Sequence, residues 1–239
     1  MILRQPTLIG VLGGMSWQST AIYYRLMNQY TQAKLGGQHS ARILMHSVDF
    51  EETHALQHAN DWVGCAEILV QAAQSLASGG AAFIVLTTNT MHKLADEIEE
   101  GAGLPLLHIA DPTGDKLRNE GLNKVGLLGT RFTMEEPFYR SRLETRFGLE
   151  TITPRKQVRE EIHRIIYQEL CKGTVTDAAR ACFRSAIEEL MQEGAQAVIL
   201  GCTEITMAVD PASVSLPVFD TTELHARAAV NLANAGTGE

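Results

Sequence analysis

Residues 9–13 read IGVLG, and the same pattern of apolar residues and glycines returns as VGLLG at residues 125–129. Continuous apolar runs of this length are typical of strands buried on both faces of a parallel sheet. The same shift along the chain pairs Tyr23 with Tyr139. A strand pattern and a residue in the following segment that repeat together indicate that one structural unit occurs twice.

Two further blocks repeat in the same order. Gly80-Ala81 followed by IVLTTN (84–89) is matched by Gly194-Ala195 followed by VILGCT (198–203), and Leu104-Pro105 is matched by Leu216-Pro217. Three matched blocks with a nearly constant offset predict an internal duplication, and two copies are too few for a solenoid.

The rest of the chain alternates short apolar runs with longer amphipathic stretches, as in α/β proteins whose parallel sheets carry helices on both faces. We therefore predict the α/β class, with two duplicated Rossmann-like lobes, parallel sheets and an active-site cleft between the lobes. The first lobe is expected over residues 1–109 and the second over residues 110–221. Seven strands are expected, at Leu8–Leu12, Ile43–Val48, Phe83–Leu86, Leu104–His108, Val125–Leu128, Ala197–Leu200 and Val218–Phe219.

The duplication gives Cys202 a counterpart, Thr88, and both residues follow the end of an expected strand. In parallel α/β lobes, residues just past the carboxyl ends of the strands line the ligand crevice. If these edges face each other, Cys202 and Thr88 approach a bound molecule from opposite sides. Two such side chains suit inversion at a carbon atom, because one can remove a proton and the other can return it.

The residues that follow each strand supply polar groups at expected helix starts. Asn89-Thr90 comes after Thr88, and Thr203-Glu204 comes after Cys202. Exposed backbone N–H groups and the helix dipole favour anions at such positions. A small carboxylate is therefore a plausible ligand here.

Composition excludes several other classes of protein. A formal net charge of -8 argues against a nucleic-acid partner. No apolar run is long enough to span a membrane, and the first residues lead directly into a strand without a signal-peptide pattern. The four cysteines show no disulfide or zinc spacing, which indicates reduced thiols in the cytoplasm and no metal.

Six segments together resemble the aspartate/glutamate racemase family, and most closely its broad-specificity amino-acid racemase branch. They are IGVLGGMSWQST (9–20), HSVDF (46–50), TNTMHK (88–93), LLGTRFTM (127–134), GCTEI (201–205) and DTTELHA (220–226). The resemblance implies a site in the cleft between the lobes, a homodimer, and neither pyridoxal phosphate nor a metal as cofactor. It also implies that the last helix, residues 222–239, returns to the first lobe.

The resemblance assigns roles to individual residues. Cys202 takes the place of the second-lobe catalytic cysteine, and Thr88 stands where the family usually has a first-lobe cysteine. The residues that match substrate-binding positions are Met15, Gln57, Asn89, Thr90, Thr130, Thr203 and Glu204.

A threonine in place of the first-lobe thiol leaves three readings open, because a hydroxyl is a far poorer base than a thiol at neutral pH. The enzyme could racemise aspartate or glutamate with Cys202 as the competent base and Thr88 relaying a proton, so that the two directions differ. It could instead be a one-base isomerase or decarboxylase, or a non-catalytic amino-acid sensor. His92 is an alternative base, and three arginines could bind a distal carboxylate: Arg25, Arg42 and Arg131.

Overall fold

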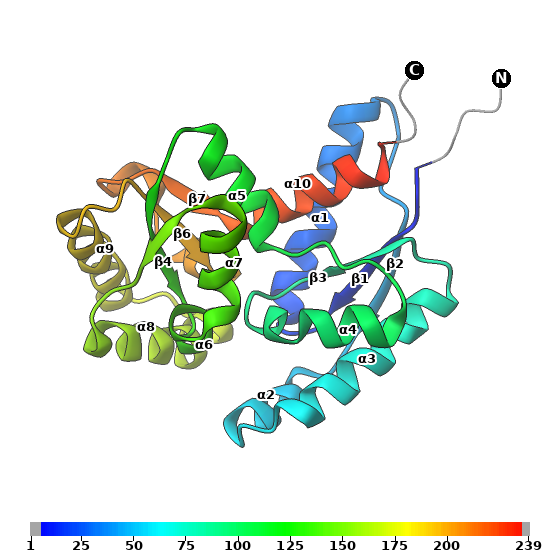
Figure 1. The fold of residues 1–239 in the computed structure, drawn as a ribbon, viewed down its shortest axis with the longest axis horizontal. Coiled ribbons are helices and arrows are strands. Elements are labelled where there is room, and N and C mark those ends of the chain that lie inside the picture. Colours follow the sequence, from blue (N-terminus) through cyan, green and yellow to red (C-terminus); the bar gives the residue numbers. More distant parts are fainter. Residues whose placement is uncertain (1–5, 236–239) are drawn as a thin grey trace. The chain divides into compact units, whose positions relative to one another are not determined.

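The computed structural model describes residues 6–235, and the chain divides into two compact units. The first unit contains the chain up to His108 together with the segment from His225 onward, and the second runs from Ile109 to Leu224. Each unit has its own sheet and its own core. Figure 1 labels the helices and strands along the chain.

The first unit is built on a three-stranded parallel sheet in the order β2-β1-β3. Its elements are β1 (Ile9–Gly13), α1 (Trp17–Leu35), β2 (Ile43–Ser47), α2 (Phe50–His58), α3 (Trp62–Ser78), β3 (Phe83–Leu86), the 3₁₀ helix η1 (Thr90–Leu94) and α4 (Ala95–Ala102). The last helix, α10 (Thr221–Ala233), begins in the second unit, and most of it belongs to the first.

The second unit has a four-stranded parallel sheet in the order β5-β4-β6-β7. Its elements are α5 (Ala110–Asn119), β4 (Lys124–Gly129), α6 (Arg131–Glu135), α7 (Pro137–Phe147), β5 (Glu150–Ile152), α8 (Lys156–Gln168), η2 (Leu170–Lys172), α9 (Asp177–Gln192), β6 (Ala197–Gly201), η3 (Thr203–Met207), η4 (Pro211–Ser213) and β7 (Val218–Asp220).

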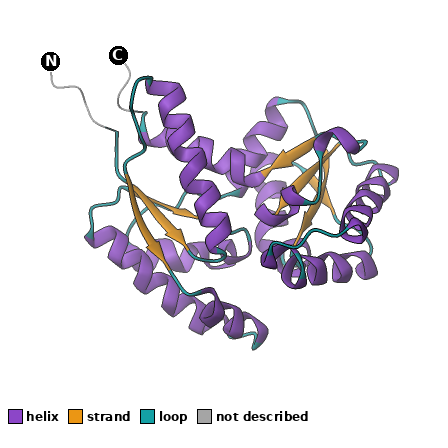
Figure 2. Cartoon of the chain, turned by 180° about the vertical axis from the view of Figure 1, so that it is seen from behind, coloured by secondary structure: helices purple, strands orange, loops and turns teal. Residues whose placement is uncertain are grey.

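In both units helices cover the two faces of the sheet, as Figure 2 shows. Alternate residues of β1 face different sides: Val11 packs with Tyr23 of α1 and Val230 of α10, whereas Leu12 packs with Leu69 of α3. Because both faces are covered, the strands are apolar throughout rather than alternating with polar residues. This confirms the α/β class and the parallel sheets that the sequence predicts.

The duplication is visible in the register of the strands. Ile9 of β1 pairs with Phe83 of β3, and the counterparts of these residues, Val125 of β4 and Ala197 of β6, also pair. Tyr23 and Tyr139 are both fully buried, on α1 and α7. The two lobes therefore share strand order, register and helix placement, as the sequence repeat predicts.

The prediction of a strand at Leu104–His108 is wrong. This segment makes a single parallel bridge, between Leu106 and Ile84, with the Ile84 N–H donating to the Pro105 carbonyl. Its counterpart in the second unit extends into β7, where Val198 pairs with Val218 and donates to the Pro217 carbonyl. The segment occupies the place of an edge strand without forming one.

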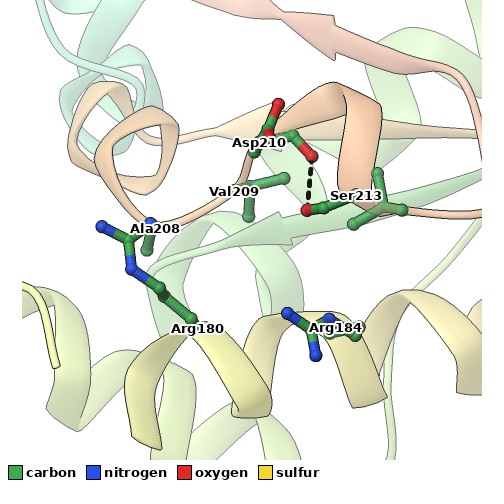
Figure 3. A pocket seen from close by; sticks show the side chains of 7 residues that line it. Arg180, Arg184, Ala208, Val209, Asp210 and Ser213 are labelled. Carbon is green, nitrogen blue, oxygen red and sulfur yellow. Dashed lines mark hydrogen bonds between the residues drawn. The ribbon is translucent and has the colours of Figure 1, made fainter. Parts of the chain in front are cut away.

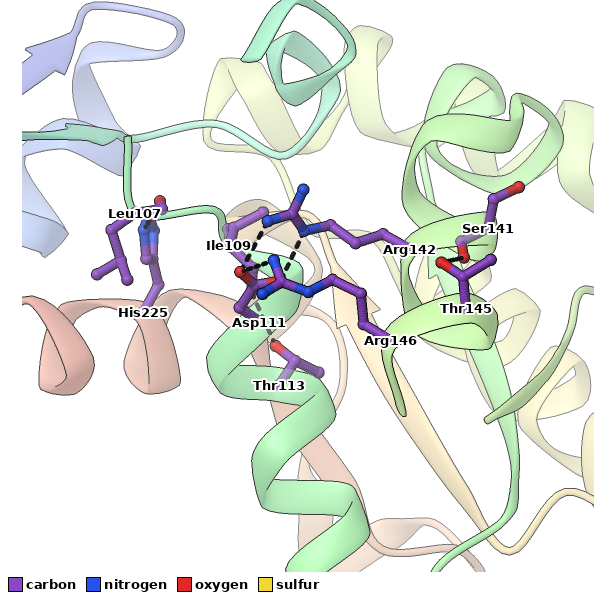
Figure 4. A network of polar contacts seen from close by, with 9 residues as sticks. All are labelled: Leu107, Ile109, Asp111, Thr113, Ser141, Arg142, Thr145, Arg146 and His225. Carbon is purple, nitrogen blue, oxygen red and sulfur yellow. Dashed lines mark hydrogen bonds and ion pairs between the residues drawn. The ribbon is translucent and has the colours of Figure 1, made fainter. Parts of the chain in front are cut away.

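An ion-pair cluster fastens α5 to α7 inside the second unit (Figure 4). Both oxygens of Asp111 accept from Arg142, at 2.6 and 2.8 Å, and Arg146 donates to the same carboxylate at 2.8 Å. Such a two-point guanidinium contact fixes orientation as well as distance. In residues 6–235, no helix has both the length and the apolar character of a membrane span.

Candidate active site

Cys202 lies directly after β6, at the point where the strand turns into η3. Its backbone is extended, with φ -159° and ψ 129°, and only 9% of the residue is exposed. The Cys202 Sγ atom lies 3.0 Å from Oε2 of Glu204, which is also buried. The thiol therefore donates a hydrogen bond to a carboxylate two residues further along the chain.

This environment keeps the thiol protonated. Burial raises the pKa of Cys202 well above its ordinary value, because a thiolate loses its hydration there. The negative charge of Glu204 and its hydrogen bond to the thiol raise this pKa further. Cys202 could therefore act as a base only after it transfers its proton to an acceptor, and the Glu204 carboxylate lies within hydrogen-bond distance.

Two residues near this pair were not expected from the sequence. Burial raises the pKa of the Tyr167 phenol, and the neighbouring ionisable groups Cys202, Cys171 and Glu204 raise it further, whereas the Arg131 charge lowers it. Burial and then the Glu204 carboxylate raise the pKa of Cys171 to about 12. Their spacing along α8 and η2 is that of ordinary packing residues, so no sequence signal marks them.

The other second-unit residues that the sequence singled out lie at the same edge of the sheet. Thr130 follows β4 and begins α6, where its hydroxyl accepts from the Thr133 N–H at 3.3 Å. Thr203 begins η3, and its hydroxyl lies 2.9 Å from that of Thr222 at the start of α10. Because β4, β6 and β7 are parallel, their carboxyl ends bring these residues to the edge that carries Cys202.

Thr88 occupies the equivalent place in the first unit, in the loop directly after β3. The side chain is half-buried, and Asn89 and Thr90 beside it are buried. The preceding residue, Thr87, ties this loop to the first turn of α1: its carbonyl accepts from the Ser19 hydroxyl at 3.1 Å, and its hydroxyl lies 3.1 Å from that of Thr20. These contacts fix the backbone on the N-terminal side of Thr88.

Met15 and Gln57 complete the first-unit set. Met15 is buried in the loop after β1, in the same apolar cluster as Met91 of η1. The Gln57 amide, on α2 after β2, donates to the Met91 sulfur at 3.3 Å. The structure therefore brings Met15, Gln57 and the turn that begins at Thr88 together at the carboxyl edge of the first sheet.

A pocket elsewhere in the second unit contains none of these residues (Figure 3). It lies between α9 and the segment of residues 208–214, with Arg180 and Arg184 on one wall. The residues that the sequence singled out lie at the strand ends instead. Within residues 6–235, no three His, Cys, Asp or Glu side chains are grouped as metal ligands would be.

Fold and strand-end residues together define the class of protein. Two duplicated α/β lobes with parallel sheets are the fold of the racemases to which this chain is similar, and a racemase is an isomerase. The model of the Asp/Glu/hydantoin racemase family matches residues 12–229, and the chain belongs to this family.

Similarity to individual proteins extends over nearly the whole chain. The chain is similar to the structure of a proposed Asp/Glu racemase from Yersinia pestis, with 52% identity, coverage of 95% of this chain and 99% of that one, and a TM-score of 0.89. An aspartate racemase homologue from Pyrococcus horikoshii OT3 is 33% identical over the same shares, with a TM-score of 0.81. The broad specificity amino-acid racemase RacX of Bacillus subtilis is 23% identical over 229 residues, which cover 94% of this chain and 97% of RacX.

Proposed function

We propose that this racemase inverts aspartate or glutamate without a cofactor, with Cys202 and Thr88 acting on opposite faces of the α-carbon. The observation that carries the proposal is the 3.0 Å contact between the Cys202 thiol and the Glu204 carboxylate. A thiol of raised pKa needs a partner that takes its proton, and this contact supplies one.

The chemistry starts with proton transfer from the Cys202 thiol to Glu204. The thiolate then removes the α-proton of the substrate, and the electron pair of the C–H bond passes into the adjacent carboxylate. On the other face, the Thr88 hydroxyl gives its proton to the α-carbon while it takes one from water. Glu204 finally releases its proton to the hydroxide left in solution, so the enzyme returns to its starting state.

Cys202 and Thr88 differ in strength as acids and bases, but thermodynamics limits how the two directions of racemisation can differ. Enantiomers have equal free energy in water, so kcat/KM must be the same in both directions. The asymmetry must instead appear in kcat and KM separately, and in exchange of the α-proton with solvent. The enantiomer whose proton faces Cys202 should exchange faster than it inverts, because the thiol can return a solvent proton to the same face.

The position of Arg131 favours an acidic substrate. Arg131 starts α6 directly after Thr130, and its charge acts on Tyr167 beside the Cys202–Glu204 pair. The alternatives are engaged elsewhere: Arg25 donates to Gln29, and Arg42 donates to the Pro6 carbonyl. A guanidinium is suited to a distal carboxylate.

Chiral chromatography of aspartate and glutamate incubated with the protein tests the proposal. We expect both enantiomers of one of these amino acids to converge on a racemic mixture. The Cys202→Ser variant should lose about 10²- to 10⁴-fold in rate, as expected for removal of a general base. Persistence of all four enantiomers, with binding seen by calorimetry, would instead identify an amino-acid sensor.

A further inference from the structure

Three buried histidines of the first unit form a cluster that is bonded to the turn carrying Thr88. They come from different parts of the chain: His92 from η1, His108 from the end of the edge segment, and His225 from α10. The ring of His92 lies edge-on to the other two, with centroid distances of 4.6 Å to His108 and 5.8 Å to His225. Burying three imidazoles is costly unless their polar atoms are used.

The hydrogen bonds of His225 fix its ring. Its Nε2 lies 2.8 Å from the Leu107 carbonyl oxygen, which can only accept, so Nε2 carries a proton (Figure 4). Its Nδ1 lies 2.9 Å from the hydroxyl of Tyr23, which is fully buried. With Nε2 protonated, Nδ1 accepts from the phenol. His225 is thereby held in one orientation, with its ring edge-on to His92.

A hydrogen bond to the turn that carries Thr88 fixes the tautomer of His92 in the same way. Its Nδ1 lies 2.7 Å from the Thr88 carbonyl oxygen, so Nδ1 carries a proton and donates it. The backbone N–H of His92 also donates to the Asn89 carbonyl at 3.1 Å. Two bonds from one residue therefore close the turn. The Thr88 side chain is attached to Cα, which is bonded to the carbonyl carbon. Fixing that carbonyl therefore restricts where the Thr88 hydroxyl can lie.

In the second unit the residue at the corresponding position also bonds a backbone carbonyl of its turn. Thr206 is the counterpart of His92 by the shift that pairs Thr88 with Cys202, and its hydroxyl donates to the Thr203 carbonyl at 2.7 Å. In both lobes, then, a side chain four residues after the catalytic position bonds a backbone carbonyl of its own catalytic turn.

We propose that His92 is a positioning residue, which holds Thr88 for proton return through its Nδ1–H bond while His108 and His225 hold the His92 ring. This inference rests on the proposed role of Thr88. It differs from the sequence-based alternative of His92 as a base, because here His92 acts by holding the turn that carries Thr88 and takes no proton from the substrate.

The test compares two variants in deuterium oxide, with α-proton exchange followed by NMR and inversion by chiral chromatography. His92→Phe keeps the ring and removes the donor, whereas His92→Asn places an amide N–H close to the position of Nδ1. We expect His92→Phe to lower inversion about 10- to 100-fold, as small misplacements of a reacting group do. Exchange with retention at the Cys202 face should persist. His92→Asn should restore the ratio of inversion to exchange to within about threefold of wild type.

The outcomes distinguish failure of the His92 positioning role from failure of the proposed racemase function. A purely structural role would lower exchange and inversion together, and an unchanged ratio in folded His92→Phe would overturn the positioning role. Wild-type protein that inverts neither amino acid would overturn the proposed function instead. If His92→Phe does not fold, long-range ¹H–¹⁵N correlation spectra of wild-type protein still decide: the Nδ1–H tautomer of His92 is expected, and the Nε2–H tautomer would contradict the contact.

Discussion

At the scale of single residues, the proposed chemistry depends on the Cys202 thiol, whose pKa burial raises, and on the Glu204 carboxylate, which would take the thiol proton. Cys202 and Glu204 are two residues apart, on a turn that puts both side chains into the same buried volume. The low effective dielectric constant of that volume strengthens their interaction. In the proposed mechanism the two residues act as one acid–base unit, so variants of each residue alone are needed to separate their contributions.

Replacing Glu204 by glutamine should lower the pKa of the Cys202 thiol and also lower the activity, although a lower pKa leaves more thiolate. The Glu204 charge raises the Cys202 pKa, so its removal should shift the pH midpoint of Cys202 alkylation to lower pH. Racemisation should nevertheless fall, because an amide cannot accept the thiol proton. Peptide-resolved mass spectrometry of iodoacetamide labelling across pH measures the first effect.

The charge-preserving variant Glu204→Asp serves as the control for that experiment. It should keep the alkylation midpoint nearer to that of wild type than Glu204→Gln does. A midpoint that rises in Glu204→Gln would show that the carboxylate does not destabilise the thiolate.

Thr88 offers the reverse experiment, in which a missing group is supplied. Thr88→Cys places a thiol at both strand ends, and a thiol is a far better base than a hydroxyl near neutral pH. We expect inversion to become a larger fraction of total exchange from the Cys202 face. Thr88→Ser, which keeps the hydroxyl, should leave that fraction close to wild type. Equal fractions in Thr88→Cys and Thr88→Ser would argue against proton return from this position.

Sequence reasoning could single out Cys202 and Thr88, because a repeat read against itself aligns the ends of equivalent strands. It could not find the proximity of Tyr167 to Cys202 and Glu204, because Tyr167 comes from a different part of the chain. It marked His92 as an alternative base but could not show the bond of its Nδ1 to the Thr88 carbonyl. Such contacts depend on how α8, α10 and η1 pack, which local patterns do not encode.

At the scale of elements, close approach between neighbouring segments explains two glycines that the repeat preserves, one in β1 and one in β4. A Cβ at Gly10 would lie 2.8 Å from the Ala81 Cβ and 3.0 Å from the Phe83 carbonyl oxygen. A Cβ at Gly126 would meet chiefly the far end of Leu190, at 2.6 Å from its Cδ1. Backbone and Cβ atoms cannot move aside, whereas a leucine tip can.

Gly10→Ala and Gly126→Ala should therefore differ in their free energy of unfolding, although the two positions are equivalent in the repeat. Gly10→Ala should lower the free energy of unfolding by about 1–3 kcal/mol through overpacking. Gly126→Ala should cost less, because Leu190 can rotate. Urea titration followed by circular dichroism compares them, and a greater loss in Gly126→Ala would contradict the packing explanation.

Strand prediction succeeded for β1, β3, β4 and β6, each a continuous apolar run, and also for the edge strands β2 and β7, all within one or two residues. It was wrong at one further edge segment and missed β5. The segment at Leu104–His108 has a similar composition but makes only one bridge. β5, with the sequence ETI, was not predicted because three mixed residues carry too little signal.

At the scale of the whole molecule, the duplication explains how the chain is shared between its units. The chain passes from the first unit to the second after His108, and it passes back after Leu224, within α10. These crossings fall at equivalent places, each following the edge segment of a lobe. Each unit thus receives the helix that follows the other unit's last edge segment, α5 for the second and α10 for the first.

The measurement that tests the central claim most directly is α-proton exchange of aspartate and glutamate in deuterium oxide with chiral analysis of the product. Wild-type protein, Cys202→Ser and Thr88→Ala would be compared. We predict exchange with inversion in wild type, loss of both in Cys202→Ser, and exchange with retention for one enantiomer in Thr88→Ala. Inversion at the wild-type rate in Thr88→Ala, or in Cys202→Ser, would contradict the assignment of these two residues.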